Sequence, residues 1–148
     1  MLTARPNGIW KTRYAISSDG ETIATWAPSL WKVGGHFELA GQRYEVRANI
    51  WGSKYGMADA DGALVAAAER VRRKHWSVEA DGQTYEFQRT SMWRHEQELC
   101  VRGQRAGSVK RVSMWRRDVV ADLPGLRLPV QIFVLAIALT KWDSTDAA

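Results

Sequence analysis

One uncharged segment near the C-terminal end limits what this chain can fold into. Residues 128–140 contain no charged side chain, whereas the preceding chain is polar and rich in turns. Pro129 suits the first turn of a helix, where its missing N–H needs no partner, and Lys141 suits a helix C-terminus. The run exceeds the ~4–8 residues of a typical buried strand, although its Val, Ile and Phe content also suits one. We therefore predict a helix over residues 128–142, with a buried strand as the alternative.

This helix is expected to be enclosed, because none of its sides is polar. Gln131 shares its side with Val134, Leu135 and Ala138. A helix that is apolar all round is buried in a protein core or in a membrane. At ~1.5 Å per residue the uncharged run reaches ~20 Å, which is short of the ~30 Å of a membrane core. We predict a core helix, followed by a disordered tail over residues 143–148.

Turn signals repeat regularly through the rest of the chain. Asp-Gly pairs between alternating segments are typical of β-hairpins, and the intervening apolar residues alternate with polar ones as strands require. The segment 41–46 (Gly-Gln-Arg-Tyr-Glu-Val) matches the segment 82–87 (Gly-Gln-Thr-Tyr-Glu-Phe). The turn glycines, 20–22 residues apart, are Gly20, Gly41, Gly62, Gly82, Gly103 and Gly125. The side chains expected to face inward are Tyr44, Val46, Ala48, Ile50, Tyr85, Phe87, Leu99 and Val101.

This period predicts about eleven or twelve antiparallel strands. An open sheet of that size has exposed edges, which closure into a barrel removes, and a barrel of that size can hold a central helix. A propeller is disfavoured, because the chain provides only about three blades and about four are usually needed. The predicted fold is mainly β: one domain over residues 1–148, in which a closed antiparallel up-and-down β-barrel of about 12 strands encloses a C-terminal hydrophobic α-helix.

Tryptophans next to basic residues lie half a period away from the glycine turns, so we expect them at the opposite end of the barrel. Residues 70–117 carry twelve basic and five acidic side chains, a net charge of +7, whereas the whole chain carries +5. Cations beside amphipathic aromatic rings suit lipid headgroups or stacked bases. The alternative is structural, with Trp capping the core and cations merely solvated. The candidate ligand-binding residues are Arg72, Arg73, Lys74, Trp76, Arg94, Arg116 and Arg117.

Residues that could support catalysis or bind a metal do not form a recognisable set. Cys100 has no placed base, and the three His show no triad order. The segment 59–62 (Asp-Ala-Asp-Gly) is similar to the start of a calcium loop but lacks the later Glu at the required spacing, so a hairpin turn is favoured. No phosphate loop or dinucleotide fingerprint follows a strand. We expect a non-enzymatic protein with no catalytic residues, no metal and no cofactor.

The pattern of the chain resembles the tubby-like superfamily, which groups tubby C-terminal domains, phospholipid scramblases and the plant LURP-one-related proteins. The resemblance is carried by residues 61–65 (Asp-Gly-Ala-Leu-Val), by the repeat beginning Gly82-Gln83, and by residues 122–124 (Asp-Leu-Pro) leading to 129–142. It implies a closed twelve-stranded barrel around a hydrophobic helix. It also implies a lipid-facing role, since tubby domains bind phosphoinositides and scramblases act at membranes with calcium. The palmitoylated cysteine cluster of scramblases has no counterpart here.

These observations lead to one expected function and two alternatives. We expect a binding module that recognises anionic lipid headgroups at a membrane surface through its basic, Trp-rich rim, without spanning the membrane. A protein–protein adaptor is one alternative, and a nucleic-acid-binding domain is the other, although it lacks a recognised motif. The single Cys and the absence of a signal-peptide core near residue 1 favour a cytoplasmic protein, peripheral to the membrane.

Overall fold

Twelve strands and one helix make up the described part of the chain. A computed structural model describes residues 1–7, 13–29, 33–91, 96–112 and 117–146. The strands are β1 (Leu2–Asn7), β2 (Arg13–Ser18), β3 (Glu21–Pro28), β4 (Gly34–Leu39), β5 (Gln42–Ala48), β6 (Tyr55–Ala58), β7 (Leu64–Glu69), β8 (His75–Ala80), β9 (Gln83–Ser91), β10 (Glu96–Val101), β11 (Gln104–Arg111) and β12 (Val119–Asp122). The helix is α1 (Leu128–Asp146).

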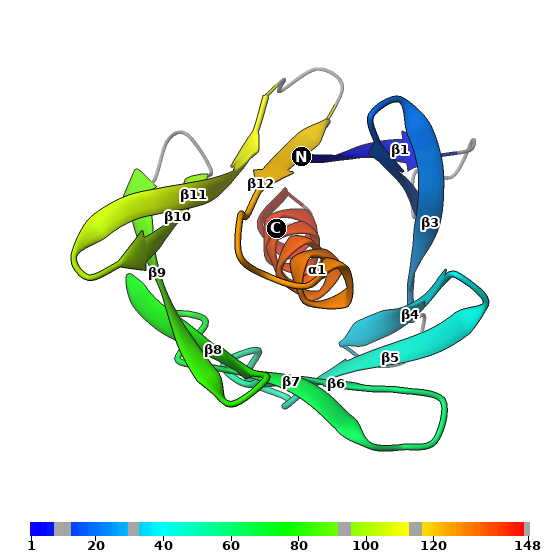
Figure 1. Ribbon diagram of the computed structural model, residues 1–148, viewed down its shortest axis with the longest axis horizontal. Helices are drawn as coiled ribbons and strands as arrows, with labels where there is room; N and C mark the ends of the chain where they lie inside the picture. The colour runs from blue at the N-terminus through cyan, green and yellow to red at the C-terminus, as the bar shows by residue number, and fades with distance from the viewer. Residues whose placement is uncertain (8–12, 30–32, 92–95, 113–116, 147–148) are drawn as a thin grey trace.

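The strands form a closed barrel in which each strand pairs with its neighbours in the sequence. Strand β1 also pairs antiparallel with β12, and Leu2 lies opposite Ala121 where the ring closes. Figure 1 shows the strands surrounding α1, which lies along the axis of the ring. The predicted fold, a closed antiparallel barrel of about 12 strands around a C-terminal helix, is confirmed.

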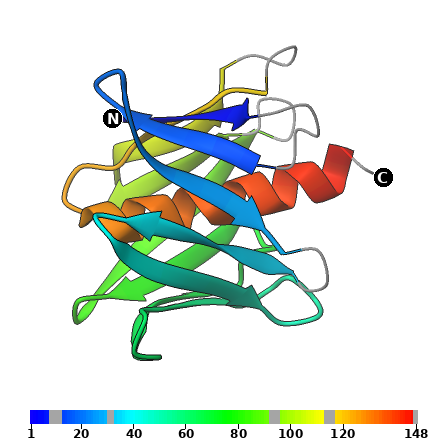
Figure 2. The ribbon, with the colours of Figure 1, turned by 90° about the vertical axis from the view of Figure 1, so that its right-hand side faces the viewer.

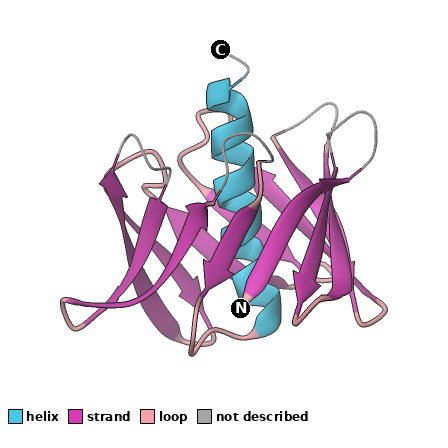
Figure 3. Cartoon of the chain, turned by 90° about the horizontal axis from the view of Figure 1, so that it is seen from above, coloured by secondary structure: helices cyan, strands magenta, loops and turns pink. Residues whose placement is uncertain are grey.

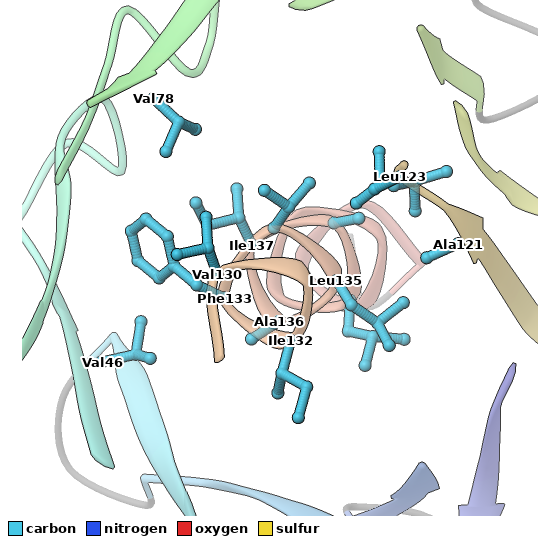
Figure 4. Close-up of a cluster of buried hydrophobic side chains, with 14 of the residues drawn as sticks. Val46, Val78, Ala121, Leu123, Val130, Ile132, Phe133, Leu135, Ala136 and Ile137 are labelled. Carbon is cyan, nitrogen blue, oxygen red and sulfur yellow. The ribbon is translucent and has the colours of Figure 1, made fainter. Parts of the chain in front are cut away.

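The helix fills the interior of the barrel. Ile132, Leu135 and Ile137 leave it in different directions and are all fully buried (Figure 4). The polar Gln131 in the first part of α1 is satisfied locally, because its Nε2 donates a hydrogen bond to the carbonyl oxygen of Leu126 at 2.8 Å. A side chain on any face of the central part of α1 therefore packs against the barrel wall. Among the described residues, no helix combines the length and the apolarity that crossing a membrane requires.

The helix is longer than predicted. It continues to Asp146, so residues 143–146 of the predicted disordered tail are helical, and 147–148 lie outside the described residues. The predicted helix ended at Trp142, because Lys141 suits a helix C-terminus. A polar side chain does not stop a helix when the backbone hydrogen bonds can continue, and α1 does continue.

Four hairpins close through two-residue turns in which both residues have positive φ. This geometry matches the twist of the flanking strands and explains the regular glycines, since glycine adopts positive φ without steric cost. The turn at residues 59–63 is built differently: Oδ1 of Asp59 accepts hydrogen bonds from the backbone N–H groups of Asp61 and Ala63, both at 3.0 Å. The hairpin interpretation of this segment is confirmed. The two-residue turns are Asp19–Gly20, Ala40–Gly41, Asp81–Gly82 and Arg102–Gly103.

Most side chains expected to face inward contribute to the core, and two do not. Ile50 and Val101 are exposed, so their predicted inward orientation was wrong. Ile50 lies beyond the end of β5, and Val101 is the last residue of β10, next to a hairpin turn. Alternation places residues correctly only in the regular interior of a strand, and the pairing of β10 with β11 shifts register between Leu99 and Cys100, just before Val101. The residues that are buried, or partly buried against the core, as predicted are Tyr44, Val46, Ala48, Tyr85, Phe87 and Leu99.

The two ends of the barrel hold different connections and opposite ends of α1. The glycine hairpins and the start of α1 lie at one end. The connections 49–54 and 70–74 lie at the other, where α1 ends and projects past the strands (Figures 2 and 3). We call these two connections, together with the C-terminal part of α1, the exit rim.

Candidate anion-binding site at one end of the barrel

The structure describes the positions of five of the seven candidate residues chosen from the sequence. Arg72, Arg73 and Lys74 are exposed in the connection between β7 and β8, on the exit rim. Arg117 is half-buried just before β12. The two others, Arg94 and Arg116, lie outside the described residues. The structure therefore brings together the first three cations as a group of adjacent, solvent-exposed charges.

Trp76, the seventh candidate, belongs to the core. Only 1% of it is exposed. Its ring stacks on Phe87 with centroids 4.6 Å apart, and its Nε1 donates a hydrogen bond to Oε1 of the buried Gln97 at 2.9 Å. The sequence suggested Trp76 as a ligand-binding residue, with a structural role in the core as the alternative, and its burial agrees with that alternative. Trp76 is a strand residue of β8 that points into the barrel, so it cannot present its face at the rim.

The connection 49–54 is held in shape by one side chain. Oδ1 of Asn49 accepts hydrogen bonds from the backbone N–H of Ser53 at 2.9 Å and of Lys54 at 3.2 Å. Nδ2 of Asn49 also donates to Oγ of Ser53 at 2.9 Å. These bonds replace the strand pairing that ends at Ala48. The two residues at the tip, Ile50 and Trp51, are consequently fixed in an orientation that leaves them 86% and 69% exposed.

The two connections of the exit rim are joined to each other. The backbone N–H of Val71 donates a hydrogen bond to the carbonyl oxygen of Ser53 at 3.0 Å. Nη1 of Arg72 donates to the carbonyl oxygen of Trp51 at 3.3 Å. The apolar tip is thus attached to the connection that carries Arg72, Arg73 and Lys74, and the exposed Lys54 lies in the same turn as the tip.

A hollow of about 450 Å³ opens between this tip and the end of the helix. Its cationic residues come from three parts of the chain, and its other walls are aromatic or apolar. The residues that line it include Ile50, Trp51, Tyr55, Arg72, Arg89 and Lys141. Since Arg89 lies on β9 and Lys141 on α1, only the closed barrel brings these groups together.

Lys141 is the most buried cation of the hollow. Its Nζ donates a hydrogen bond to the carbonyl oxygen of Val71 at 2.9 Å and lies 5.9 Å from the centre of the Trp76 ring, a cation–π distance. Burial, with a smaller contribution from the positive charge of Arg89, lowers the pKa of Lys141 to about 8. The ammonium form therefore lacks much of its usual solvation and gains from any anion that reaches it.

Tyr55 adds a neutral polar group to the hollow. It is only 4% exposed, and burial raises the pKa of its hydroxyl to about 12, so the hydroxyl keeps its proton at physiological pH. Among the described residues this hydroxyl has no hydrogen-bond partner. Tyr55 lines the hollow, so its hydroxyl is available as a donor to a molecule that enters there.

Sequence reasoning found part of this site and missed the rest. The pairing of Trp51 with Lys54 was visible as one of the Trp/basic clusters, and the 72–74 cations were chosen directly. Arg89 and Tyr55 gave no signal, because each is an ordinary strand residue in the sequence. Lys141 was expected only to stabilise the end of the helix.

Groups elsewhere offer less chemistry. Burial, followed by the charge of Glu98, raises the pKa of Cys100, which disfavours the reactive thiolate. In the described part of the chain, no three His, Cys, Asp or Glu residues are grouped as a metal site would need. The exit rim is therefore the best candidate for function.

Comparison with known proteins does not assign the chain to a family. No family model matches it, and no match was found among curated proteins or among solved structures.

Proposed function

We propose that this protein is a non-enzymatic, cytoplasmic module that binds anionic lipid headgroups at a membrane surface through its exit rim. The observation that supports it most directly is the joining of an exposed apolar tip, Ile50 and Trp51, to three exposed cations, Arg72, Arg73 and Lys74. An exposed Ile beside an exposed Trp has no folding benefit, so a partner surface is the simplest reason for it.

Membrane interfaces favour this combination for two separate reasons. Tryptophan prefers the headgroup level of a bilayer, because its ring is apolar and its N–H is polar. Each Lys or Arg near an anionic surface contributes about 1 kcal/mol, and the attraction is screened over roughly 8 Å at physiological salt. A fixed tip flanked by cations satisfies both requirements, and the tubby-like resemblance leads to the same expectation.

A protein partner is the second candidate, since exposed Trp next to Arg also typifies interaction hot spots. Lipid is preferred because the exit rim also carries several adjacent positive charges. An anionic membrane surface attracts such charges without needing a specifically placed carboxylate for each of them. Nucleic acid remains the third candidate, because aromatic rings beside cations also bind single strands.

Vesicle co-sedimentation tests the proposal. The wild type should bind vesicles containing phosphatidylserine or a phosphoinositide at low salt, lose them at high salt and ignore neutral vesicles. The variant Arg73→Ser/Lys74→Ser should bind much more weakly. Its matched control is Arg43→Ser/Arg47→Ser, which removes the same charge from the outer wall, where both residues form exposed ion pairs with Glu45. Equal loss in the two variants would reduce the effect to net charge and remove the case for the exit rim.

A further inference from the structure

We infer that the hollow beside the exit rim is a specific pocket for a phosphate monoester, whose phosphate lies among Arg72, Arg89 and Lys141 and whose organic part contacts Ile50 and Trp51. This deepens the proposed function and rests on it, since a lipid that carries such a phosphate is one source of the ligand. A soluble phosphate ester is the other source.

Three positively charged side chains gather in the hollow. Arg72, Arg89 and Lys141 line one hollow at the barrel mouth, although like charges repel more strongly where water is partly excluded. In the described part of the chain, neither Arg72 nor Arg89 forms an ion pair with a carboxylate. A dianion placed between them would relieve the repulsion. A phosphate monoester carries close to two negative charges and accepts several hydrogen bonds from guanidinium and ammonium groups.

Two of the three cations, Arg72 and Lys141, are oriented before any ligand arrives. Lys141 is held by its bond to the carbonyl of Val71 and by the Trp76 ring beneath it, and Arg72 is held by its bond to the carbonyl of Trp51. Groups fixed in this way lose little conformational freedom on binding. Arg73 and Lys74, by contrast, are exposed side chains that form no such contacts with the described residues, which suits attraction to a surface rather than recognition of one group.

The Tyr55 hydroxyl supports the pocket for a reason that does not involve positive charge. It belongs to a side chain that is 4% exposed, it lines the hollow, and it has no partner among the described residues. A phosphate oxygen is a suitable acceptor for it. On the opening side, Ile50 and Trp51 supply apolar surface for the organic part of the ligand.

Calorimetric titration of the full chain with two soluble probes tests this pocket. Dihexanoyl phosphatidic acid supplies a phosphate monoester with an apolar part, and glycerol 3-phosphate supplies the monoester alone. We expect the first to bind more tightly. Lys141→Met and Arg89→Met should each lower the affinity for both probes by about tenfold or more, since a charge-assisted hydrogen bond is lost. Trp51→Ser should lower the affinity only for dihexanoyl phosphatidic acid. The control Lys54→Met removes a rim charge outside the hollow and should leave both affinities unchanged.

The result that would overturn the pocket is unchanged affinity in both Lys141→Met and Arg89→Met, or no binding of either probe by the wild type. Vesicle binding is a separate measurement. If vesicles bind and the probes do not, the pocket is wrong while the membrane function stands. If the probes bind and vesicles of phosphatidylcholine with phosphatidic acid do not, the pocket stands, the membrane function falls, and the source is a soluble ester. The variant Arg73→Ser/Lys74→Ser should no longer bind vesicles but should still bind both probes.

Discussion

Lys141 extends from the central helix to the barrel wall, where its Nζ donates a hydrogen bond to the carbonyl oxygen of Val71 at 2.9 Å. Val71 is fully buried and follows the last strand residue of β7 by two positions. The bond therefore ties the end of α1 to the connection that carries Arg72, Arg73 and Lys74. It also places an ammonium group where water only partly reaches it.

Lys141→Met should stabilise the protein at neutral pH. The unfolded chain holds this proton with the ordinary pKa of 10.5, whereas the folded chain holds it with a pKa of about 8, so burial of the charged form opposes folding. Removing the charge should raise the free energy of unfolding on the order of 2 kcal/mol, at the cost of the Val71 bond. Urea unfolding of both proteins measures the difference.

The advantage of that variant should depend on pH with a definite sign. Below about pH 8 both states of the wild type bind the proton and the penalty is fully present. As pH rises from about 8 towards 10.5, the unfolded state binds more protons than the folded state, so wild-type stability increases relative to the variant. Unfolding at pH 7 and pH 9.5 checks this. A difference that stays constant or grows with pH would contradict the burial of the charge.

A charge in the middle of α1 should prevent folding. Leu135→Lys and Ile137→Asp place ionisable groups among fully buried neighbours on different sides of the helix, where an unpaired charge costs several kcal/mol or more. Soluble expression and the thermal transition should both be lost. Leu64→Lys is the matched control: Leu64 is 70% exposed on the outer wall, and its replacement should leave the transition nearly unchanged. A folded Leu135→Lys variant would mean that the helix is not enclosed.

Two hairpin turns can be improved. Ala40 and Arg102 occupy the first turn position with φ of 52°, a left-handed conformation that suits Asn and Asp far better. Ala40→Asn and Arg102→Asn should each raise the free energy of unfolding by about 0.5–1 kcal/mol. The control Arg102→Ala removes the same side chain without supplying a left-handed preference, so it should give no gain in a urea titration.

Gly107→Ala should be strongly destabilising. A Cβ at this position in β11 would lie 2.3 Å from the carbonyl oxygen of Asp122, which is backbone and cannot move without disturbing β12. Overpacking of this kind costs about 1–3 kcal/mol or more. Gly56→Ala is the control, because its Cβ would meet only Leu64 Cδ1 at 3.5 Å, an ordinary contact. Thermal unfolding of both variants distinguishes a general glycine effect from this close approach.

The parts of the fold that depend on local chemistry could be predicted from the sequence. The helix followed from an uncharged run with Pro129 at its start, and the hairpins followed from glycines that positive φ requires. Ile50 was misplaced because alternation does not show where a strand ends, and here β5 ends two residues earlier. Trp76 lies in the core, in agreement with the structural alternative for the tryptophans, because a residue next to a basic turn can already belong to a strand.

The hollow could not be predicted, for a geometric reason. Tyr55, Arg89 and Lys141 are far apart in the sequence, and they come together only when β6, β9 and α1 occupy their places in a closed ring. No pairwise pattern in the sequence carries that information. By contrast, Arg72, Arg73 and Lys74 are consecutive, so their common location needed only the prediction of a turn.

The closure of the ring also determines when this chain can fold during its synthesis. Leu2 pairs with Ala121, so β1 has no neighbour on one side until β12 has been translated. The apolar helix that fills the interior is made later still. Until it emerges, the strands have a hydrophobic inner face and nothing to cover it. The strands of this barrel are therefore exposed to aggregation until translation reaches α1, and the barrel should depend on chaperones more than a helical protein of equal length.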